Sequence, residues 1–263
     1  MSSRLCLSWH ESMTGFTAAG SVMIRVIVLL SLGFTPSWAS AEAYRGLPLP
    51  TNLIAFDDPA GQAMLLRSGY KYDFWTLNRW FISQEAPAYC GIAASVMVLN
   101  ALGIPAPPAA DPKYPALFTQ QNFFTDRVAR VLPAEQVSRR GVTLEGLAAA
   151  LKTFPLDVRE THARPGGLYA FISQAKRVLQ AGHGYLIVNY LRSALGQQTY
   201  GHFSPVAAYD EMRDRFLILD VARYKYPPVW VRSEELYAAM QAYDRDAKAP
   251  RGYLVLAERG KRG

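Results

Sequence analysis

The sequence of 263 residues contains little cysteine, only Cys6 and Cys90. Cys6 lies in an N-terminal segment that we expect to be removed, so the mature chain has a single thiol with no partner for a disulfide. A fold held by disulfides is therefore excluded. We expect no metal ligand set, because one cysteine and three histidines remain and none has the spacing of zinc ligands. Cys90 is then either buried and inert or kept for its reactivity.

Clusters of basic residues with interleaved aromatic residues are also absent. The formal net charge is +7, but the basic residues are dispersed, so we expect no binding to nucleic acid. Half of the residues are hydrophobic and 19% are charged, which is ordinary for a soluble globular protein. No repeat, low-complexity tract or long linker follows Ala41, so residues 42–263 are expected to form a single domain.

The first 41 residues are typical of a secretory signal peptide. A basic start at Arg25 precedes the short apolar run 26–34, and Ala39-Ser40-Ala41 forms a cleavage pattern. Met23 is an alternative start of translation. The apolar run is too short to span a bilayer, so we expect no stable membrane insertion after cleavage, although an uncleaved anchor is the alternative. The sequence therefore predicts an exported, periplasmic protein.

Hydrophobic periodicity predicts helices in the first part of the chain and strands after Gly182. Helices are expected from Cys90 to Gly103, over residues 144–154 with Thr143 as the N-cap, and over 168–179. Strands are expected at residues 185–190, 203–209, 215–221 and 252–257, the second and third of them forming a hairpin. This order predicts an α+β fold in which a helical N-terminal lobe packs on an antiparallel β-sheet lobe, with a cleft between them.

Cys90 lies where a loop passes into the first predicted helix. Unpaired backbone N–H groups and the positive end of the helix dipole favour a thiolate at this position. Gln84, six residues earlier, can donate an amide N–H to an oxyanion. Downstream, His202 and Asp220 supply an imidazole and a carboxylate. The chain thus contains a nucleophile, a base, an acid to orient that base, and an oxyanion donor.

The hairpin decides whether His202 and Asp220 can meet. A turn of three or five residues would place them on the same face, whereas a turn of two or four residues, or a bulge, would place them on opposite faces. The alternation of Leu217, Leu219 and Val221 makes Asp220 face away from these apolar side chains. A carboxylate in such a strand is costly to bury without a partner, and an imidazolium across the ladder would be that partner.

Each candidate also has a structural interpretation. A lone buried cysteine is more often inert than catalytic, and a histidine in a strand usually fills a structural role. The order of the four candidates and their sequence contexts together favour catalysis. His162, which we place in a polar loop, and His183, between two glycines, are expected to have no special role.

Three segments closely resemble the phytochelatin synthase family. They are Gln84-x-x-Pro87-Ala88-Tyr89-Cys90-Gly91, Gly201-His202-Phe203-Ser204-Pro205, and the unusual block 219–231 that begins Leu219-Asp220-Val221. The resemblance to the short bacterial members of the family covers nearly all of the mature chain. It implies a papain-like cysteine protease fold, a catalytic triad of Cys90, His202 and Asp220, and Gln84 in the oxyanion hole.

The resemblance also implies a reaction with glutathione, γ-Glu-Cys-Gly. The thiolate would attack the carbonyl of the Cys-Gly bond, glycine would leave, and the γ-glutamylcysteinyl thioester would be hydrolysed or transferred to a second glutathione, which yields phytochelatin. Substrate-binding residues are expected to be Gly91, Gly201, Arg223 and Arg251. The two guanidinium groups suit the carboxylates of the substrate.

The same resemblance gives the expected cofactors and partners. Hydrolysis requires no cofactor, and heavy-metal ions such as cadmium or zinc would enter as a metal–thiolate substrate for transfer. Glutathione is the expected partner, and a homodimer is compatible with the family. Plant members carry an additional cysteine-rich C-terminal domain, which this sequence lacks, and we therefore expect hydrolysis to dominate over transfer.

Two other functions fit parts of the sequence. A periplasmic cysteine peptidase that cleaves peptidoglycan would use the same Cys–His chemistry, but it would not explain the block 219–231. A non-catalytic protein that binds metal–glutathione complexes would use Cys90 as a soft ligand.

Overall fold

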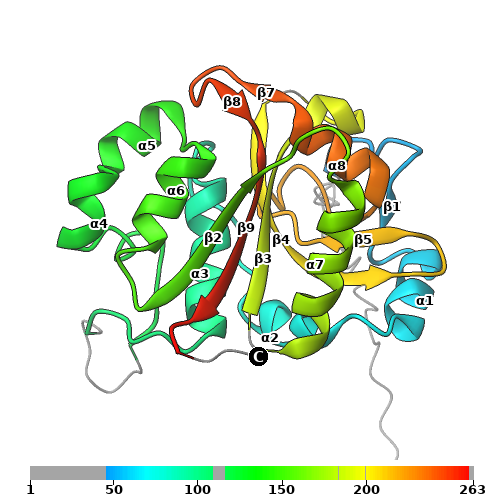
Figure 1. Cartoon of the computed structure of the whole chain (residues 1–263), viewed down its shortest axis with the longest axis horizontal. Helices are drawn as coiled ribbons and strands as arrows, with labels where there is room; N and C mark the ends of the chain where they lie inside the picture. The colour runs from blue at the N-terminus through cyan, green and yellow to red at the C-terminus, as the bar shows by residue number, and fades with distance from the viewer. Residues whose placement is uncertain (1–45, 109–115, 183, 199, 261–263) are drawn as a thin grey trace, which may run out of the picture. The chain divides into compact units, whose positions relative to one another are not determined.

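An antiparallel sheet of seven strands forms the centre of the computed structural model, which describes residues 46–108, 116–182, 184–198 and 200–260 (Figure 1). The helices are α1 (Pro59–Arg67), α2 (Tyr72–Arg79), α3 (Cys90–Ala101), α4 (Asp126–Val131), α5 (Ala134–Arg140), α6 (Leu144–Leu151), α7 (Leu168–Ala181), the short 3-10 helix η1 (Arg192–Leu195) and α8 (Ser233–Gln241). The strands are β1 (Ile54–Ala55), β2 (Leu156–His162), β3 (Gly184–Leu191), β4 (Gly201–Asp210), β5 (Arg215–Ile218), β6 (Val229–Arg232), β7 (Tyr243–Asp244), β8 (Ala249–Pro250) and β9 (Gly252–Glu258).

The strands of the large sheet follow the order β1-β6-β5-β4-β3-β9-β2, and each neighbouring pair is antiparallel. Strand β3 lies between β4 and β9 and is buried along nearly its whole length. Its continuous apolar sequence is the pattern expected of a fully buried strand. The late strand β9 pairs with both β3 and β2, so the sheet is completed only by residues near the end of the chain.

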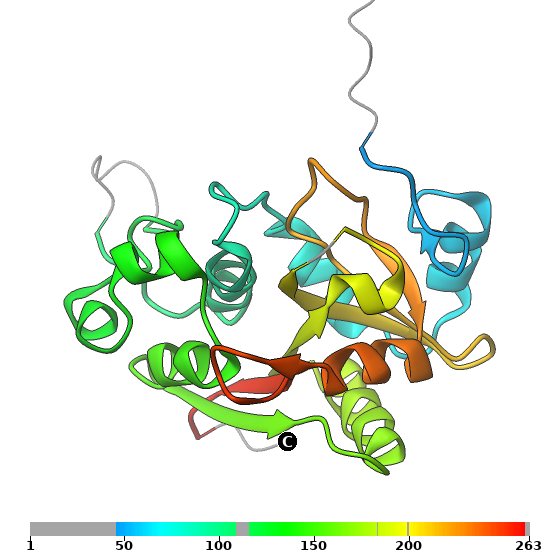
Figure 2. The ribbon, with the colours of Figure 1, turned by 90° about the horizontal axis from the view of Figure 1, so that it is seen from above.

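Side chains of the sheet alternate between two hydrophobic cores. On one face, residues such as Ile187 and Phe203 pack with α2, α3 and α6. On the other face, residues such as Leu186 and Val206 pack with α7 and α8. Figures 1 and 2 show helices on both sides of the strands. The predicted α+β class is confirmed, but the predicted two layers are incomplete because α7 and α8 form a third.

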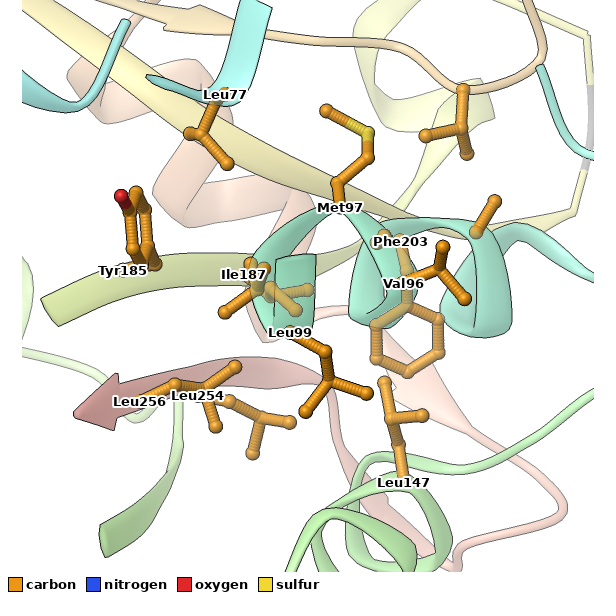
Figure 3. Packing of buried hydrophobic residues seen from close by; sticks show 14 of the residues in the cluster. Leu77, Val96, Met97, Leu99, Leu147, Tyr185, Ile187, Phe203, Leu254 and Leu256 are labelled. Atoms are coloured by element: carbon orange, nitrogen blue, oxygen red, sulfur yellow. The ribbon is translucent and has the colours of Figure 1, made fainter. Parts of the chain in front are cut away.

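Helix α3 is buried from Cys90 to Leu99. Its apolar side chains face more than one direction. Met97 points toward Leu77 of α2, whereas Leu99 lies on the opposite side, toward β9 and Leu254 (Figure 3). A helix that is apolar all round must be enclosed. This enclosure fixes the position of its first residue, Cys90, within the protein.

The predicted helix ends are close to those observed. The Oγ1 atom of Thr143 accepts a hydrogen bond from the Gly146 N–H at 3.1 Å, which confirms the N-cap of α6. Gly182 follows α7 with a φ of 67°, a conformation that glycine adopts most readily. The expected signal peptide, residues 1–41, and His183 lie outside the described residues.

Two predictions about strands were wrong. Strand β2 was not expected, and His162 is its last residue, opposite Gly252 of β9, rather than part of a polar loop. Strand β5 ends at Ile218, so Asp220 lies in the loop that follows it.

Among the helices that the structure describes, none is both long and apolar enough to cross a membrane.

Candidate active site

The β4–β5 hairpin brings His202 and Asp220 into contact because its turn and a β-bulge have opposite effects on which face each side chain takes. The four residues 211–214 form the turn, and a turn of this length alone would put the two side chains on opposite faces. Between Val206 and Ala208, however, the pairing register shifts by one residue. This bulge reverses the alternation a second time. The four-residue turn alone, or the bulge alone, would place His202 and Asp220 on opposite faces. The two together place both side chains on the same face, where they can meet.

The three predicted catalytic side chains lie together in a buried position. Nε2 of His202 is 2.9 Å from Oδ1 of Asp220. The Cys90 thiol lies beside the His202 side chain and the backbone N–H of Phe203, and both groups lower its pKa. Because Nε2 of the imidazole faces the carboxylate, Nδ1 is the nitrogen left for the thiol. The exposed fractions are 8% for Cys90, 4% for His202 and 0% for Asp220, so the charges of these groups are poorly screened by water.

The surroundings of Cys90 and His202 favour an ion pair between them. Burial by itself would raise the pKa of the Cys90 thiol, but the charge and hydrogen bond of His202, the Phe203 N–H and the charge of Arg192 lower it below its ordinary value. Burial would lower the pKa of His202, but Asp220 and Cys90 raise it. Both shifts stabilise a thiolate next to an imidazolium, which is the reactive state of a cysteine nucleophile.

Asp220 is held as a carboxylate. Its Oδ1 atom accepts hydrogen bonds from Nη2 of Arg192 at 2.7 Å, from Nε2 of His202 at 2.9 Å and from the Ala222 N–H at 2.8 Å. Burial opposes ionisation, but these partners lower the pKa of Asp220 to about 2. Asp220 therefore stays negative at neutral pH and can stabilise the imidazolium beside it.

Arg192 is a site residue that the sequence did not reveal. It is the first residue of η1, directly after β3, and its side chain is 4% exposed. Its guanidinium donates to Asp220 and to Oε1 of Gln197 at 2.7 Å, and it lies 5.2 Å from the ring centroid of Tyr226. The only feature of the sequence that could have pointed to Arg192 was its position just after a buried strand. The positive charge of Arg192 balances the negative charge of the buried Asp220 carboxylate.

Gln84 lies beside the site with its amide group already engaged. Its backbone N–H donates to the Val221 carbonyl at 2.8 Å, and its Nε2 donates to the carbonyls of Ala86 at 2.8 Å and Pro87 at 2.9 Å. These bonds brace the loop that leads into Cys90. Donation to an oxyanion would require one amide hydrogen to be redirected. The backbone N–H of Cys90, at the start of α3, has no carbonyl four residues earlier within the helix, so it is a second candidate donor to an oxyanion.

Arg251 lies directly against Gly201, the residue before His202. A Cβ atom on Gly201 would lie 2.2 Å from Nη1 of Arg251, so the guanidinium occupies the space that any other residue would fill. Nη1 donates to Oδ1 of Asn189 at 3.0 Å and to Oδ2 of Asp244 at 2.8 Å. Two of the predicted binding residues are thus in contact, and the arginine is held at the end of β4 that carries His202.

The other two predicted binding residues have different surroundings. Gly91 is buried in α3, and a Cβ atom there would come 2.8 Å from Cγ1 of Val142 and 3.3 Å from Cδ2 of Phe203. Close packing of α3 therefore accounts for this glycine. Arg223 is exposed, and its guanidinium lies 4.6 Å from the ring centroid of Phe81. Its position leaves it accessible to an anionic group in solution.

Comparisons with known proteins agree on one family. A family model described as phytochelatin synthase matches residues 44–253. Glutathione gamma-glutamylcysteinyltransferase 3 of Lotus japonicus is 34% identical over 225 residues, covering 84% of this chain and 45% of that protein. Glutathione gamma-glutamylcysteinyltransferase of Schizosaccharomyces pombe is 29% identical over 221 residues, covering 79% of this chain and 50% of that protein. The chain thus spans about half the length of these relatives.

A search of solved structures gave a weaker similarity. A fragment of prointerpain A from Prevotella intermedia has a TM-score of 0.40 and 14% sequence identity, covering 81% of this chain and 78% of that one.

Proposed function

The chain belongs to the phytochelatin synthase family, and on this basis we propose that it is a thiol-dependent glutathione γ-glutamylcysteinyl hydrolase and transferase. The observation that carries the proposal is the buried cluster that Cys90, at the start of α3, forms with His202 and Asp220. Its charge distribution favours a thiolate, which is the nucleophile that acyl transfer requires. The substrate is proposed from the names of the relatives.

In the first half of the reaction, the Cys90 thiolate attacks the carbonyl carbon of the Cys-Gly bond in glutathione. A C–S bond forms, and the carbonyl oxygen becomes an oxyanion that accepts a hydrogen bond from the Cys90 N–H. His202 then donates its Nδ1 proton to the amide nitrogen as the C–N bond breaks. Glycine leaves, and a γ-glutamylcysteinyl thioester remains on Cys90.

In the second half, neutral His202 removes a proton from the nucleophile that attacks the thioester. Water yields γ-Glu-Cys, whereas the amine of a second glutathione yields a longer γ-glutamylcysteinyl peptide. The C–S bond breaks in both cases, and the thiolate–imidazolium pair is restored. Asp220 keeps the hydrogen of Nε2 in place throughout, which leaves Nδ1 for proton transfer. Cadmium or zinc would take part as a thiolate complex of the substrate in the transfer reaction.

Substrate carboxylates are assigned to the two arginines. Arg251 would bind the α-carboxylate of the γ-glutamyl group, because its guanidinium is held beside Gly201 at the start of β4, one residue from His202. Asp244 and Asn189 fix its orientation, which reduces the entropy lost when a carboxylate binds. Arg223, exposed above Phe81, is assigned to the carboxylate of glycine or of the acceptor.

We also propose that the protein acts in the periplasm after export. The basic start, apolar run and Ala39-Ser40-Ala41 pattern of residues 1–41 support this location. The mass of the protein recovered from the periplasm of expressing cells tests it. A mature chain that begins at Glu42 is expected, and a protein confined to the cytoplasm with residues 1–41 intact would contradict the proposal.

Mass spectrometry of the intact protein tests the chemistry. After brief exposure to glutathione and an acid quench, the protein should gain the mass of glutathione minus glycine, and peptide mapping should place it on Cys90. Cys90→Ser should gain no mass and release no glycine. A gain equal to whole glutathione that dithiothreitol removes would be a mixed disulfide and would count against an acyl-enzyme.

Parallel incubations separate the alternative functions. Cleavage of muropeptides in the absence of glutathione cleavage would identify a peptidoglycan peptidase. Retention of metal–glutathione complexes without turnover, lost in Cys90→Ser, would identify a binding protein. The proposal expects glycine release from glutathione and neither of these results.

A further inference from the structure

A second cluster of titratable side chains lies between α6 and β2. It consists of Glu145, Glu160 and His162, whose potential ligand atoms all lie within 4.8 Å of one another. Glu145 is in the first turn of α6. Glu160 and His162 are two positions apart on β2, so their side chains project from the same face of the strand. Figure 1 shows α6 lying along β2.

The face of β2 that carries this cluster changes from apolar to polar along the strand. Leu156 and Val158 on this face belong to the hydrophobic core that also contains α6. The next two positions of the same face are Glu160 and His162. They occur where the first turn of α6 supplies Glu145. Two potential metal ligands therefore stand on the face of β2 where its pattern would otherwise place apolar residues, and they meet a third from α6.

The orientation of His162 leaves one ring nitrogen facing the carboxylates. Its Nδ1 is 2.5 Å from the carbonyl oxygen of Pro250. A carbonyl only accepts, so Nδ1 carries the hydrogen. Nε2 then has a lone pair in the neutral ring, and it faces Glu145 and Glu160. A backbone carbonyl that fixes the tautomer in this way is the usual support of a histidine that binds a metal.

The distances within the cluster are compatible with an ion held between the three groups. Nε2 lies 3.2 Å from Oε1 of Glu145 and 3.4 Å from Oε1 of Glu160. Hydrogen bonds between an imidazolium and a carboxylate are shorter, about 2.7–2.9 Å. Ligand atoms placed tetrahedrally around zinc at its usual bond lengths are about 3.3 Å apart.

The charges of the cluster are also unbalanced. Within the described parts of the chain, His162 is the only basic side chain within 4.0 Å of either carboxylate. Oε2 of Glu145 is buried without a hydrogen-bond partner there. Two carboxylates and a neutral imidazole carry a charge of −2, which a divalent cation would neutralise. The side chains are 21–39% exposed, so an ion can reach them from solvent.

We propose that Glu145, Glu160 and His162 form a site for a zinc ion, with water as the fourth ligand. Imidazole and carboxylate together are ligands that zinc accepts readily. The absence of ligand spacing had argued against any metal site, but the ligands come from a helix and a strand that the fold brings together. An ion here would be linked through His162 to Pro250, the residue before Arg251.

Isothermal titration calorimetry with zinc tests the site, and it does not require the protein to catalyse any reaction. Every protein in the series carries Cys90→Ser, so that the catalytic thiol cannot bind the ion. The parent should bind one zinc ion per chain. Glu160→Gln and His162→Gln should each weaken binding by at least ~10-fold. Asp157→Asn removes an acid at an exposed position of β2 and should leave the affinity unchanged.

Thermal unfolding checks that the variants are folded and supplies a second measurement. Zinc should raise the Tm of the parent and of Asp157→Asn, but not that of Glu160→Gln. Without metal, Glu160→Gln should have a Tm equal to or above that of the parent, because two facing carboxylates repel each other. The proposal is overturned if the parent shows no saturable binding, or if its affinity is unaffected by both Glu160→Gln and His162→Gln.

Discussion

Nε2 of His202 lies 2.9 Å from Oδ1 of Asp220, and this contact determines which ring nitrogen serves Cys90. An ionised carboxylate only accepts hydrogen bonds, so Nε2 carries a hydrogen and Nδ1 is the ring nitrogen left for the thiol. The same oxygen accepts a hydrogen bond from Arg192. Thiolate, imidazolium, carboxylate and guanidinium together have no net charge. This balance explains how four ionisable groups can be buried at one place.

Asp220→Asn should narrow the pH range in which the Cys90–His202 ion pair exists. Asp220 raises the pKa of His202, and the imidazolium in turn lowers the pKa of Cys90. Without the carboxylate, the pKa of His202 should fall and that of Cys90 should rise. The onset of alkylation by iodoacetamide should therefore move to higher pH, and the alkaline limb of turnover to lower pH. We expect kcat to fall by about 10²–10⁴-fold.

The control for this variant is Asp157→Asn, at an exposed position of β2, which should keep the pH profiles of alkylation and of turnover unchanged. An Asp220→Asn protein with the alkylation profile of the wild type would show that Asp220 does not control the ion pair.

Arg192→Gln should destabilise the protein because it leaves the buried charge of Asp220 with one partner fewer. We expect the free energy of unfolding in denaturant to fall by about 3 kcal/mol. Arg139, which pairs with Glu135 on the surface, provides the matched comparison. Arg139→Gln should change the free energy by less than about 0.5 kcal/mol. Equal effects of the two substitutions would contradict the role assigned to Arg192.

Gly201→Ala should displace the guanidinium of Arg251, since the new Cβ would lie 2.2 Å from Nη1. The KM for glutathione should rise about 10-fold, which corresponds to about 1.4 kcal/mol of lost binding. Arg251→Ala should have a similar effect, and the double variant should be no worse than Arg251→Ala alone. Gly69→Ala, where a Cβ meets nothing within 4 Å, is the control. Additive effects of the two substitutions would refute the contact.

Asp73→Asn should stabilise the protein at alkaline pH. Asp73 is 1% exposed, and burial raises its pKa from 3.8 to about 8. The native state therefore keeps this proton up to about pH 8, whereas the unfolded state loses it near pH 4. Stability contributed by the neutral form is lost as pH rises through this range. The variant should gain about 1–3 kcal/mol at pH 9 and less at pH 5.

Denaturant unfolding at both pH values measures this difference, with Asp57→Asn at an exposed position as the control. A gain that is the same at pH 5 and pH 9 would show that Asp73 does not carry a shifted pKa.

The sequence by itself determined the local features of this protein. The Thr143 cap, the left-handed Gly182 and the helix that starts at Cys90 depend on residues a few positions away, so short patterns predict them. The catalytic candidates Cys90, His202 and Asp220 were also identified in this way, from their neighbours and from the family motifs. Their catalytic roles remain predictions, and the structure shows that the three side chains lie together.

Only the tertiary structure decided which groups meet. The contact of His202 with Asp220 depends on a turn and a bulge whose effects cancel, and alternation of side chains cannot reveal a register shift. Arg192 and the Glu145–Glu160–His162 cluster were missed because their partners are supplied by other elements. Strand β2 pairs with β9 near the end of the chain. Such pairing depends on hydrogen bonds and packing between distant segments, which no local pattern records.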